Sequence, residues 1–207
     1  MTVTAAATPS ESVVGVFGGS FNPPHTGHVA LARAVVAAGM ADMVLMVVSP
    51  QNPLKTGCAD LAPDSARLEM TRLATAPYPE LEVSDIEMSM PRPSFTVDTL
   101  DRLAALHPRW RLRLIVGADN WAVFDRWKRG DYIAANYAPI VYPRPGIELY
   151  GADGHLLREG AEVLADAPRF QVSSTEIRRR LASGEPVNNM VAPGVIEYIN
   201  AHRLYQK

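Results

Sequence analysis

The sequence predicts an α/β fold in which helices cover both faces of a doubly wound parallel sheet, with two further helices at the C-terminal end of a single domain. Three observations support this prediction. Short apolar segments alternate along the chain with segments of helical periodicity, as in repeated βα units. The apolar segment at residues 43–48 is continuous, which is typical of a strand covered on both faces. A length of 207 residues with 47% hydrophobic residues suits one domain with a buried core.

The first third of the chain predicts two strands and two helices. Residues 13–17 form an apolar strand and residues 29–38 a helix, since a continuous apolar run gives way to helical spacing. Residues 43–48 form the second strand. Residues 49–61 contain two prolines and a glycine and predict a loop long enough to be functional. Residues 63–76 again have apolar side chains at helical spacing, with Pro63 suited to a helix start.

The middle third continues this alternation. Residues 81–86 predict a short strand, and residues 96–106 predict a helix whose apolar side chains share one face. Residues 111–116 predict a strand, because apolar and polar side chains alternate at its start. The segments 118–124 and 131–135 predict short helical pieces.

The last third predicts a strand at residues 139–142, a partly helical segment at residues 154–165 and a final short strand at residues 169–172. Two helices, residues 174–183 and 193–202, close the chain. No repeat and no interdomain linker interrupts this order. Because parallel βα units have right-handed crossovers, we expect ligands beyond the carboxyl ends of the strands, where the chain order reverses.

Composition and charge exclude several functional classes. A net charge of −2 and a pI of about 6.2 argue against a general binder of nucleic acid or of membrane surfaces. The single cysteine, Cys58, excludes an internal disulfide, and no role is assigned to it. Residues 1–12 lack the features of a signal peptide and predict a flexible tail before a domain at residues 13–207. The longest apolar run is too short for a bilayer, so a cytoplasmic protein is expected.

The most informative segment lies between the first predicted strand and the first predicted helix. It reads Gly-Gly-Ser-Phe-Asn-Pro-Pro-His-Thr-Gly-His over residues 18–28. Gly18 and Gly19 let the backbone approach a ligand closely, and the helix start that follows presents free N–H groups that suit phosphate. His25 and His28 are three residues apart and share one side of the first helical turn, where each can donate a hydrogen bond to phosphate. The segment predicts a phosphate-binding turn.

Ordinary loop chemistry accounts for any one of these residues. Gly-Gly and Pro-Pro are common in turns, and a lone histidine near a helix start is usually a capping or surface residue. The combination of glycines, prolines and histidines within eleven residues weakens that explanation. The segment is not a Walker A loop, because no Gly-Lys-Ser/Thr closes it, and its glycine spacing does not match the dinucleotide-binding fingerprint.

The segment resembles the HxGH signature of the nucleotidyltransferase superfamily, and it is most similar to that of the bacterial nicotinate mononucleotide adenylyltransferases. The resemblance extends in separated blocks from Val13 to Tyr205. It implies a Rossmann-like nucleotidyltransferase fold. It also implies that both histidines are catalytic and that ATP is bound by residues of this segment: Gly18, Gly19, Ser20, Phe21, His25 and His28.

A second block, residues 172–178, begins the first of the two closing helices. Ser173 followed by Glu176 is the pattern of a capping box at a helix start. The same geometry offers an anion site, with hydroxyls at Ser174 and Thr175 and the guanidinium of Arg178 one turn further on. In the family that the chain resembles, this block binds the ATP phosphates. The resemblance therefore implies that all three residues bind ATP and that the arginine is catalytic, whereas the neighbouring arginines gain no such support.

Gly117 and Asp119 follow the strand predicted at residues 111–116. Glycine lets an adenine or ribose pack against the backbone, and the Asp119 carboxylate can accept hydrogen bonds from ribose hydroxyls or cap a helix. The resemblance favours a contact with ATP at both residues. It also favours Arg144 as a ligand for the phosphate of the acceptor nucleotide, although Pro-Arg-Pro-Gly at residues 143–146 is also the pattern of a plain turn.

The pyridine ring of the acceptor is assigned by resemblance to two further segments. A tryptophan of the family stacks on this ring, which favours Trp127 over Trp121 and Trp110. The block Ser-Phe-Thr-Val-Asp-Thr-Leu at residues 94–100 resembles a helix start of the family. Backbone N–H groups near Phe95 and Thr96 are therefore expected to bind the pyridine carboxylate, which favours nicotinate over nicotinamide.

One segment departs from the family pattern. Many relatives carry His-Lys in the loop after the second strand, where this sequence has Asn-Pro-Leu-Lys at residues 52–55. Lys55 is retained as a candidate ligand for phosphate of the acceptor, whereas the histidine role is absent.

The resemblance implies transfer of AMP from ATP to nicotinate mononucleotide, with the deamido dinucleotide and pyrophosphate as products. The acceptor phosphate is already an anionic nucleophile, so catalysis needs in-line positioning and charge stabilisation rather than a strong general base. Mg²⁺ is expected to enter with ATP and to keep mostly water ligands, so no metal site is predicted in the protein. No nucleic-acid or membrane partner is expected. The sequence leaves the oligomeric state open, a homo-oligomer included.

Two alternatives remain. A sister nucleotidyltransferase would use phosphopantetheine or glycerol phosphate as acceptor, or CTP as donor, and Trp127, Arg144 and residues 94–100 disfavour it. A nucleotide-binding regulator would sense the dinucleotide without turnover, and intact catalytic histidines disfavour it. The preferred prediction requires the imidazole pair and the Arg178 guanidinium to converge on one cleft in the folded chain.

Overall fold

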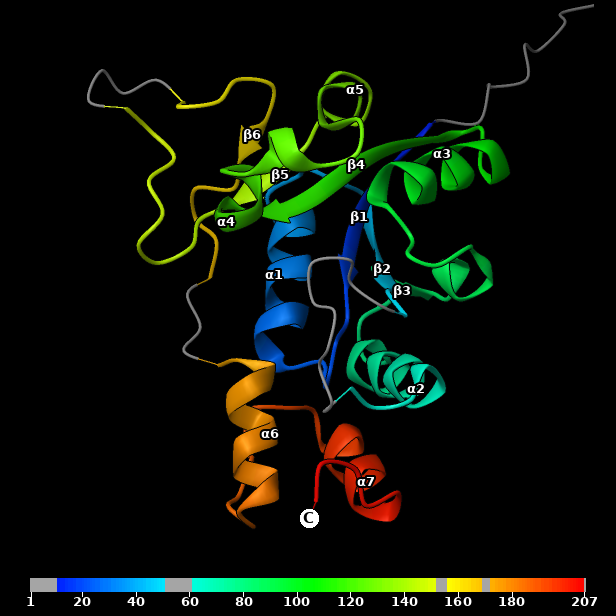
Figure 1. The fold of residues 1–207 in the computed structure, drawn as a ribbon, viewed down its shortest axis with the longest axis vertical. Helices are drawn as coiled ribbons and strands as arrows, with labels where there is room; N and C mark the ends of the chain where they lie inside the picture. The colour runs from blue at the N-terminus through cyan, green and yellow to red at the C-terminus, as the bar shows by residue number, and fades with distance from the viewer. Residues whose placement is uncertain (1–10, 51–60, 152–155, 169–171, 207) are drawn as a thin grey trace, which may run out of the picture.

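The computed structural model describes residues 11–50, 61–151, 156–168 and 172–206. Its centre is one six-stranded sheet in the order β3-β2-β1-β4-β5-β6, in which all neighbouring strands are parallel (Figure 1). The chain winds outward from β1 in one direction and from β4 in the other, which confirms the predicted doubly wound α/β class. The strands are β1 Ser12–Gly19, β2 Met43–Val48, β3 Leu81–Ser84, β4 Trp110–Gly117, β5 Ile140–Tyr142 and β6 Glu162–Val163.

Helices connect the strands and follow the last of them. Those before β4 are α1 Thr26–Ala37, α2 Asp64–Thr75, the 3₁₀ helix η1 Ile86–Ser89 and α3 Thr96–Leu106. Those after β4 are α4 Ala118–Trp121, the 3₁₀ helix η2 Phe124–Arg126, α5 Gly130–Asn136, α6 Ser174–Ala182 and α7 Pro193–Ala201. Figure 1 shows α6 and α7 close together, with the C-terminus beside them. In the part of the chain that the structure describes, no helix has the length and apolar character needed to cross a membrane.

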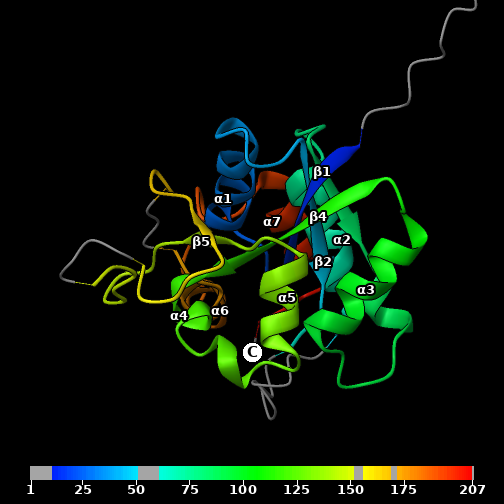
Figure 2. The ribbon, with the colours of Figure 1, turned by 90° about the horizontal axis from the view of Figure 1, so that it is seen from above.

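Each face of the sheet has its own hydrophobic core. Successive side chains of β2 divide between the two, since Met46 joins the core beneath α1 and α2 while Leu45 joins the core beneath α3. The first core extends to Ile177 of α6 and Ile199 of α7, which are both fully buried. Figure 2 shows α1 and α5 on opposite sides of β4. Burial on both faces explains why the β2 sequence is continuously apolar.

The ends of several predicted elements shift by a few residues. α1 begins at Thr26, before the predicted start, because His25 acts as its N-cap with extended backbone directly after two prolines. Pro63 is the N-cap of α2 rather than its first helical residue. Ser12, expected in the N-terminal tail, pairs with Trp110 in the β1–β4 ladder. The strand predicted at residues 81–86 is shorter, because η1 begins at its last residue.

The prediction of partial helix at residues 154–165 is wrong. In the described part of this segment, Leu156 forms an antiparallel bridge with Tyr150, and Glu162 and Val163 form the edge strand β6. β6 hydrogen-bonds to β5, so pairing with an open sheet edge outweighs a weak local preference for helix. Of the strand predicted at residues 169–172, the first three residues lie outside the described part of the chain, and Val172 is not in a strand.

Candidate active site

Two adjoining cavities open near the carboxyl ends of β1 and β4, where the strand order reverses. The smaller one, of about 220 Å³, is called the aromatic cavity here because Phe95 and Trp127 line it. The larger one, of about 1500 Å³, is called the cationic cleft because Arg92, Arg144 and Arg178 line it. Residues 17–20, at the end of β1, line both cavities and form a common wall. Ligands that bind in the two cavities would therefore meet at this wall.

The histidine pair lies at the start of α1 and lines the cationic cleft. The rings of His25 and His28 are stacked, with 3.6 Å between their centroids. The backbone N–H of His25 donates to Nδ1 of His28 at 3.2 Å. This bond uses the lone pair of Nδ1, so a neutral His28 carries its proton on Nε2 and can donate a hydrogen bond from there.

The His25 ring is neutral at physiological pH. Burial, with the positive charge of Arg144 adding to its effect, lowers the pKa of His25 from 6.5 to about 4. Its Nδ1 atom is buried and has no hydrogen-bond partner among the described residues. A neutral imidazole can donate one hydrogen bond to a phosphate oxygen, and it adds no charge to a cleft already lined by arginines.

Phe21 positions the histidine pair by packing. It is 2% exposed and has a φ of 43°, a left-handed conformation that is rare for an aromatic residue. Its ring lies edge-on against His28, with 5.1 Å between centroids. A Cβ at Gly19 would lie 2.9 Å from the Phe21 ring, so a glycine is needed there. The buried ring leaves the Phe21 backbone as the part that can contact a nucleotide.

α6 brings Arg178 to the same turn. Its Nη1 donates to the Asn22 carbonyl at 3.0 Å, and its Nε is buried without a hydrogen-bond partner among the described residues. The Ser174 hydroxyl donates to the Pro23 carbonyl at 2.8 Å. That proton is already used to hold the turn, which leaves the backbone N–H of Ser174 as its donor for an anion. Thr175 is exposed and lines the cleft.

The start of α6 forms one of the two hydrogen bonds of the expected capping box, the one to the Ser173 side chain. Ser173 Oγ accepts a hydrogen bond from the backbone N–H of Glu176 at 3.2 Å. The Glu176 carboxylate accepts instead from Arg179 at 2.9 Å and from Arg180 at 2.7 Å. Arg179 and Arg180 are therefore engaged in ion pairs outside the cleft, whereas Arg178 lines it.

Gly117, Asp119 and Arg144 lie close together beside the end of β4. Gly117 is the N-cap of α4, and a Cβ there would lie 3.1 Å from the Tyr142 ring. Arg144 Nε lies 3.7 Å from Oδ1 of Asp119, and Arg144 Nη2 donates to the Tyr142 hydroxyl at 3.0 Å. Asp119 and Arg144 line the cationic cleft. The positive charge of Arg144 acts on the histidine pair, because it contributes to the lowered pKa of His25.

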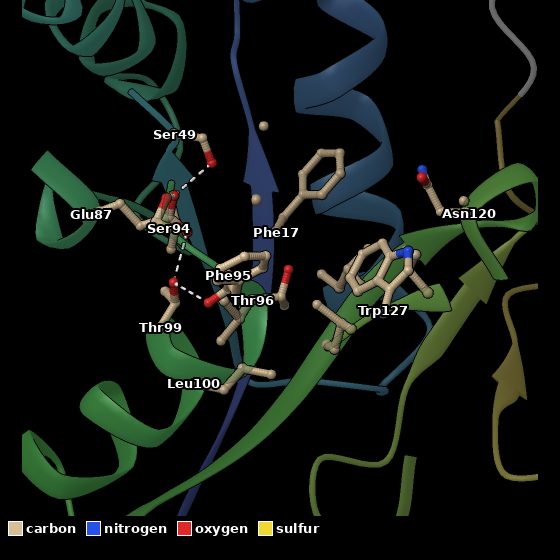
Figure 3. A pocket seen from close by; sticks show the side chains of 18 of the residues that line it. Phe17, Ser49, Glu87, Ser94, Phe95, Thr96, Thr99, Leu100, Asn120 and Trp127 are labelled. Atoms are coloured by element: carbon tan, nitrogen blue, oxygen red, sulfur yellow. Dashed lines mark hydrogen bonds between the residues drawn. The ribbon is translucent and has the colours of Figure 1, made fainter. Parts of the chain in front are cut away.

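Trp127 is the tryptophan that lines the aromatic cavity (Figure 3). Phe124 supports its indole ring, with 4.8 Å between centroids. The other two tryptophans lie elsewhere: Trp121 is 2% exposed in the core, and Trp110 stacks on His107 at the opposite end of β4. This placement supports the preference for Trp127 as the ring that contacts an aromatic ligand.

Phe95 and Thr96 form the start of α3 in the wall of the same cavity. Phe95 is the N-cap and Thr96 is the first helical residue. Lys128 Nζ lies 4.7 Å from the centre of the Phe95 ring and pairs with Asp98 at 2.8 Å. The first N–H groups of a helix have no intrahelical acceptor and carry partial positive charge, which suits a carboxylate ligand.

Sequence reasoning missed Glu87, which lines the aromatic cavity. Its carboxylate is only 6% exposed and accepts hydrogen bonds from the hydroxyls of Ser49 at 2.8 Å, Ser94 at 2.7 Å and Thr99 at 2.8 Å (Figure 3). These bonds join the end of β2, η1 and the start of α3. The available signal was an acidic residue shortly before the block at residues 94–100, which alone does not distinguish a buried carboxylate from an exposed one.

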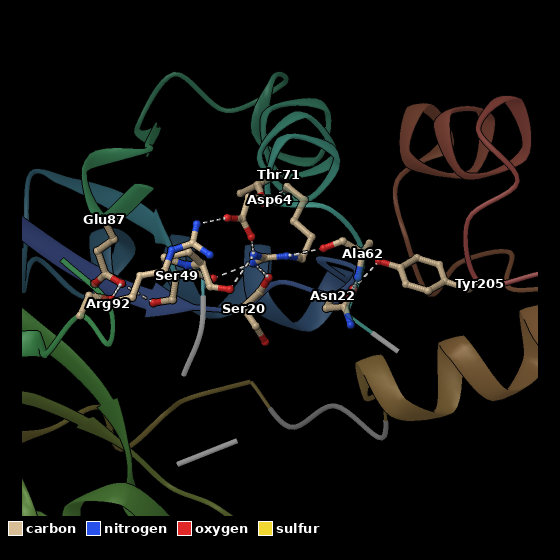
Figure 4. A network of polar contacts seen from close by, with 12 residues as sticks. Ser20, Asn22, Ser49, Ala62, Asp64, Thr71, Glu87, Arg92 and Tyr205 are labelled. Atoms are coloured by element: carbon tan, nitrogen blue, oxygen red, sulfur yellow. Dashed lines mark hydrogen bonds and ion pairs between the residues drawn. The ribbon is translucent and has the colours of Figure 1, made fainter. Parts of the chain in front are cut away.

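Sequence reasoning also missed Arg67, whose side chain is fully buried. Its Nη1 donates to the carbonyls of Ser20 and Ser49, both at 2.7 Å, and its Nε donates to the carbonyl of Ala62 at 3.0 Å. Figure 4 labels the three residues that accept these bonds. Asp64 supplies the countercharge. The residue therefore ties the turns that follow β1 and β2 to the start of α2. Its place on the buried face of α2 was the signal in the sequence.

Lys55 and Cys58 lie outside the described residues, as does most of the loop predicted at residues 49–61. The role expected for Lys55 stays a prediction.

Comparisons with known proteins agree with this geometry. The model of the cytidylyltransferase-like family matches residues 16–180. The "Probable nicotinate-nucleotide adenylyltransferase" of Bacteroides fragilis is 43% identical over 190 residues, 92% of each chain. The protein of the same name from Thermus thermophilus is 39% identical over 193 residues, 93% of this chain and 99% of that one. The solved structure of Plasmodium falciparum nicotinic acid mononucleotide adenylyltransferase complexed with NaAD has the same fold, with a TM-score of 0.74 at 18% identity over 94% of this chain and 97% of that chain.

Proposed function

The chain belongs to the cytidylyltransferase-like family and, with its relatives, to the nicotinate-nucleotide adenylyltransferases, and from this premise we propose how its two cavities divide the reaction. The reaction is the transfer of AMP from ATP to nicotinate mononucleotide, which gives nicotinate adenine dinucleotide and pyrophosphate in NAD biosynthesis. The observation that carries the proposal is the common wall of residues 17–20 between an aromatic cavity and a cationic cleft. A mononucleotide with an aromatic ring and a triphosphate suit two such adjoining cavities.

Nicotinate mononucleotide is assigned to the aromatic cavity. Its pyridine ring stacks on Trp127, and its carboxylate accepts hydrogen bonds from the backbone N–H groups at Phe95 and Thr96. Its phosphate then points toward the cationic cleft, where Arg144 is the candidate ligand, with Lys55 as a second one. This arrangement favours nicotinate over nicotinamide, because a neutral amide gains less than a carboxylate from a helix start.

ATP is assigned to the cationic cleft, with the triphosphate between the histidine pair and α6. His25, His28 and Arg178 donate to phosphate oxygens, while the base and ribose lie near Gly117 and Asp119. The remaining contacts come from the common wall, from Phe21 directly after it and from the start of α6: Gly18, Gly19, Ser20, Phe21, Ser174 and Thr175.

Catalysis then consists of alignment and charge stabilisation. An oxygen of the acceptor phosphate forms a bond to the α-phosphorus of ATP, and the bond from that phosphorus to the bridging oxygen of pyrophosphate breaks with its electron pair. The nucleophile is an anion at neutral pH, so the step needs no general base. Neutral His25 and the neighbouring His28 donate to the α-phosphate oxygens as charge develops, and Arg178 stabilises the departing pyrophosphate.

Mg²⁺ enters this scheme as part of the ATP substrate. Within the described residues no group of three or more His, Cys, Asp or Glu side chains is arranged to hold a metal ion. The phosphate oxygens and water supply its ligands, and its charge offsets that of the triphosphate. A cytoplasmic location is part of the same proposal.

A coupled assay of pyrophosphate release tests the assignment. The enzyme is supplied with ATP, Mg²⁺ and either nicotinate or nicotinamide mononucleotide, and in parallel with phosphopantetheine, glycerol phosphate, or CTP in place of ATP. We expect release with ATP and nicotinate mononucleotide, and a lower kcat/KM with the amide. Release with another pair alone contradicts the assignment, and no release with any pair supports a regulator instead.

A further inference from the structure

The chain turns back on itself after α7. The backbone N–H of Leu204 donates to the carbonyl of Ile199 at 3.0 Å, and both Arg203 and Tyr205 have left-handed backbone, with φ of 50° and 62°. This conformation is costly for residues with large side chains and persists only where surrounding contacts hold it. Leu204 and Tyr205 pack against the hydrophobic core that also contains Ile199. The turn therefore places the Tyr205 side chain in one defined position.

That position is directly behind the wall of the cationic cleft. The Tyr205 hydroxyl donates to Oδ1 of Asn22 at 2.6 Å (Figure 4). The same oxygen accepts from the backbone N–H of Ala62 at 3.1 Å, and Asn22 is only 4% exposed. Burial raises the pKa of the Tyr205 phenol, so the hydroxyl keeps its proton and remains a donor throughout the physiological range.

Asn22 links this contact to the cleft. Its backbone carbonyl accepts the hydrogen bond from Arg178 Nη1 at 3.0 Å. Asn22 and Arg178 both line the cleft, and the histidine pair begins three residues further along the chain. A shift of the asparagine would therefore move the acceptor that orients the Arg178 guanidinium, together with the turn that leads to His25.

We propose that Tyr205 is a positioning residue for adenylyl transfer, which holds Asn22 in place and thereby aims the Arg178 guanidinium at the ATP phosphates. The inference rests on the proposed function, in which Arg178 binds those phosphates. Tyr205 acts through Asn22 and lies behind the residues that line the cleft. The C-terminal turn is thus a support of the ATP subsite and not only a packing element.

The first test is Tyr205→Phe, which removes one hydroxyl and retains the ring. One hydrogen bond to a buried acceptor is lost, so we expect kcat/KM for ATP to fall about three- to tenfold, with KM for nicotinate mononucleotide changed less than about twofold. The matched control is Tyr198→Phe on α7, a half-buried tyrosine that packs against His202 and lies outside the site. This control should retain the kinetics of the parent enzyme.

The second test is a double-mutant cycle with Arg178→Lys. If Tyr205 acts through Asn22 on the guanidinium, the effect of Tyr205→Phe should shrink to less than about twofold in the Arg178→Lys background. A loss of folding stability would lower activity equally in both backgrounds, and that additive result overturns the inference. So does a Tyr205→Phe enzyme that is as active as the parent.

A binding measurement separates this inference from the proposed reaction. Calorimetric titration with a non-hydrolysable ATP analogue reports the ATP subsite without turnover, and Tyr205→Phe should weaken binding about three- to tenfold, unlike Tyr198→Phe. A parent protein that binds the analogue but releases no pyrophosphate with any acceptor contradicts the proposed reaction alone. Equal binding by parent and Tyr205→Phe contradicts the positioning role alone.

Discussion

The stacked rings of His25 and His28 can share one cleft with three arginines because the His25 ring does not add a positive charge. Burial and Arg144 keep His25 neutral, and the bond from the His25 backbone to Nδ1 of His28 directs the second ring to donate from Nε2. Hydrogen-bond donors that are already oriented before the reaction need no reorganisation when charge develops on a phosphate. In the proposed reaction, whose nucleophile needs no base, the two imidazoles would therefore act as hydrogen-bond donors.

Replacing His28 by alanine removes one such donor. The loss of a preorganised donor to a charged transition state costs about 10²–10³ in turnover. We expect kcat for pyrophosphate release to fall by that factor in His28→Ala, measured at saturating ATP and nicotinate mononucleotide. His107→Ala, whose ring stacks on Trp110 at the far end of β4, is the control and should stay active. Near-normal turnover of His28→Ala would remove His28 from the mechanism.

The lowered pKa of His25 predicts a pH dependence of stability. Between pH 6.5 and about 4 the unfolded chain binds a proton at this residue and the folded chain does not, so acidification favours unfolding. His25→Asn retains a residue that suits an N-cap and removes this titration. Between pH 7.5 and 5, the parent should lose about 2 kcal/mol more unfolding free energy than His25→Asn, measured by urea denaturation. Parallel pH profiles of the two proteins would show that His25 titrates normally.

At the level of elements, the site is built from helix starts. α1, α3 and α6 each present their first turn to one of the two cavities, and each start is held by contacts outside its own helix. The Ser174 hydroxyl of α6 bonds to the Pro23 carbonyl, and Ser94 and Thr99 at the start of α3 bond to Glu87. Such anchoring fixes the direction of the free N–H groups at each helix start. Anion binding by these groups depends on that direction.

The anchor at Glu87 can be tested separately from the ATP subsite. Glu87→Ala removes the shared acceptor of the Ser49, Ser94 and Thr99 hydroxyls, of which the last two are buried, and this loosens the start of α3. We expect KM for nicotinate mononucleotide to rise about tenfold, since an unmade buried hydrogen bond costs about 1–3 kcal/mol, while KM for ATP stays within about twofold. The exposed Glu82→Ala on β3 is the control. An equal rise in both KM values would contradict a local role.

At the scale of the whole molecule, Arg67 connects parts that the sheet alone does not hold together. Its bonds reach the turns after β1 and β2 and the start of α2, so it sets the spacing between the walls of the two cavities. Arg67→Met leaves these carbonyls without their donor and Asp64 with its ion pair to Arg92 alone, and we expect a loss of about 3–5 kcal/mol of unfolding free energy, measured by urea denaturation. Arg72→Met, on the exposed side of the same helix, should change it by less than about 0.5 kcal/mol. Equal losses in both variants would contradict this role.

The features of this molecule that could be predicted are those that depend on patterns of consecutive residues. The βα alternation predicted the sheet, and the blocks at residues 18–28, 94–100 and 172–178 predicted the helix starts that line the cavities. Glu87, Arg67 and Tyr205 were missed because each has at least one partner that is distant in the chain, and an isolated charged or phenolic side chain does not reveal its burial. The edge strand β6 was missed because its two residues gain their structure only from pairing with β5.

The partition formed by residues 17–20 has a consequence for the design of inhibitors. A single synthetic molecule with an aromatic acid at one end and a short polyanion at the other would cross this partition and occupy both compartments at once. Tethering the two ends makes the second contact intramolecular, so such a compound should bind far more tightly than either fragment alone. The length of the tether would then decide how much of this gain is realised.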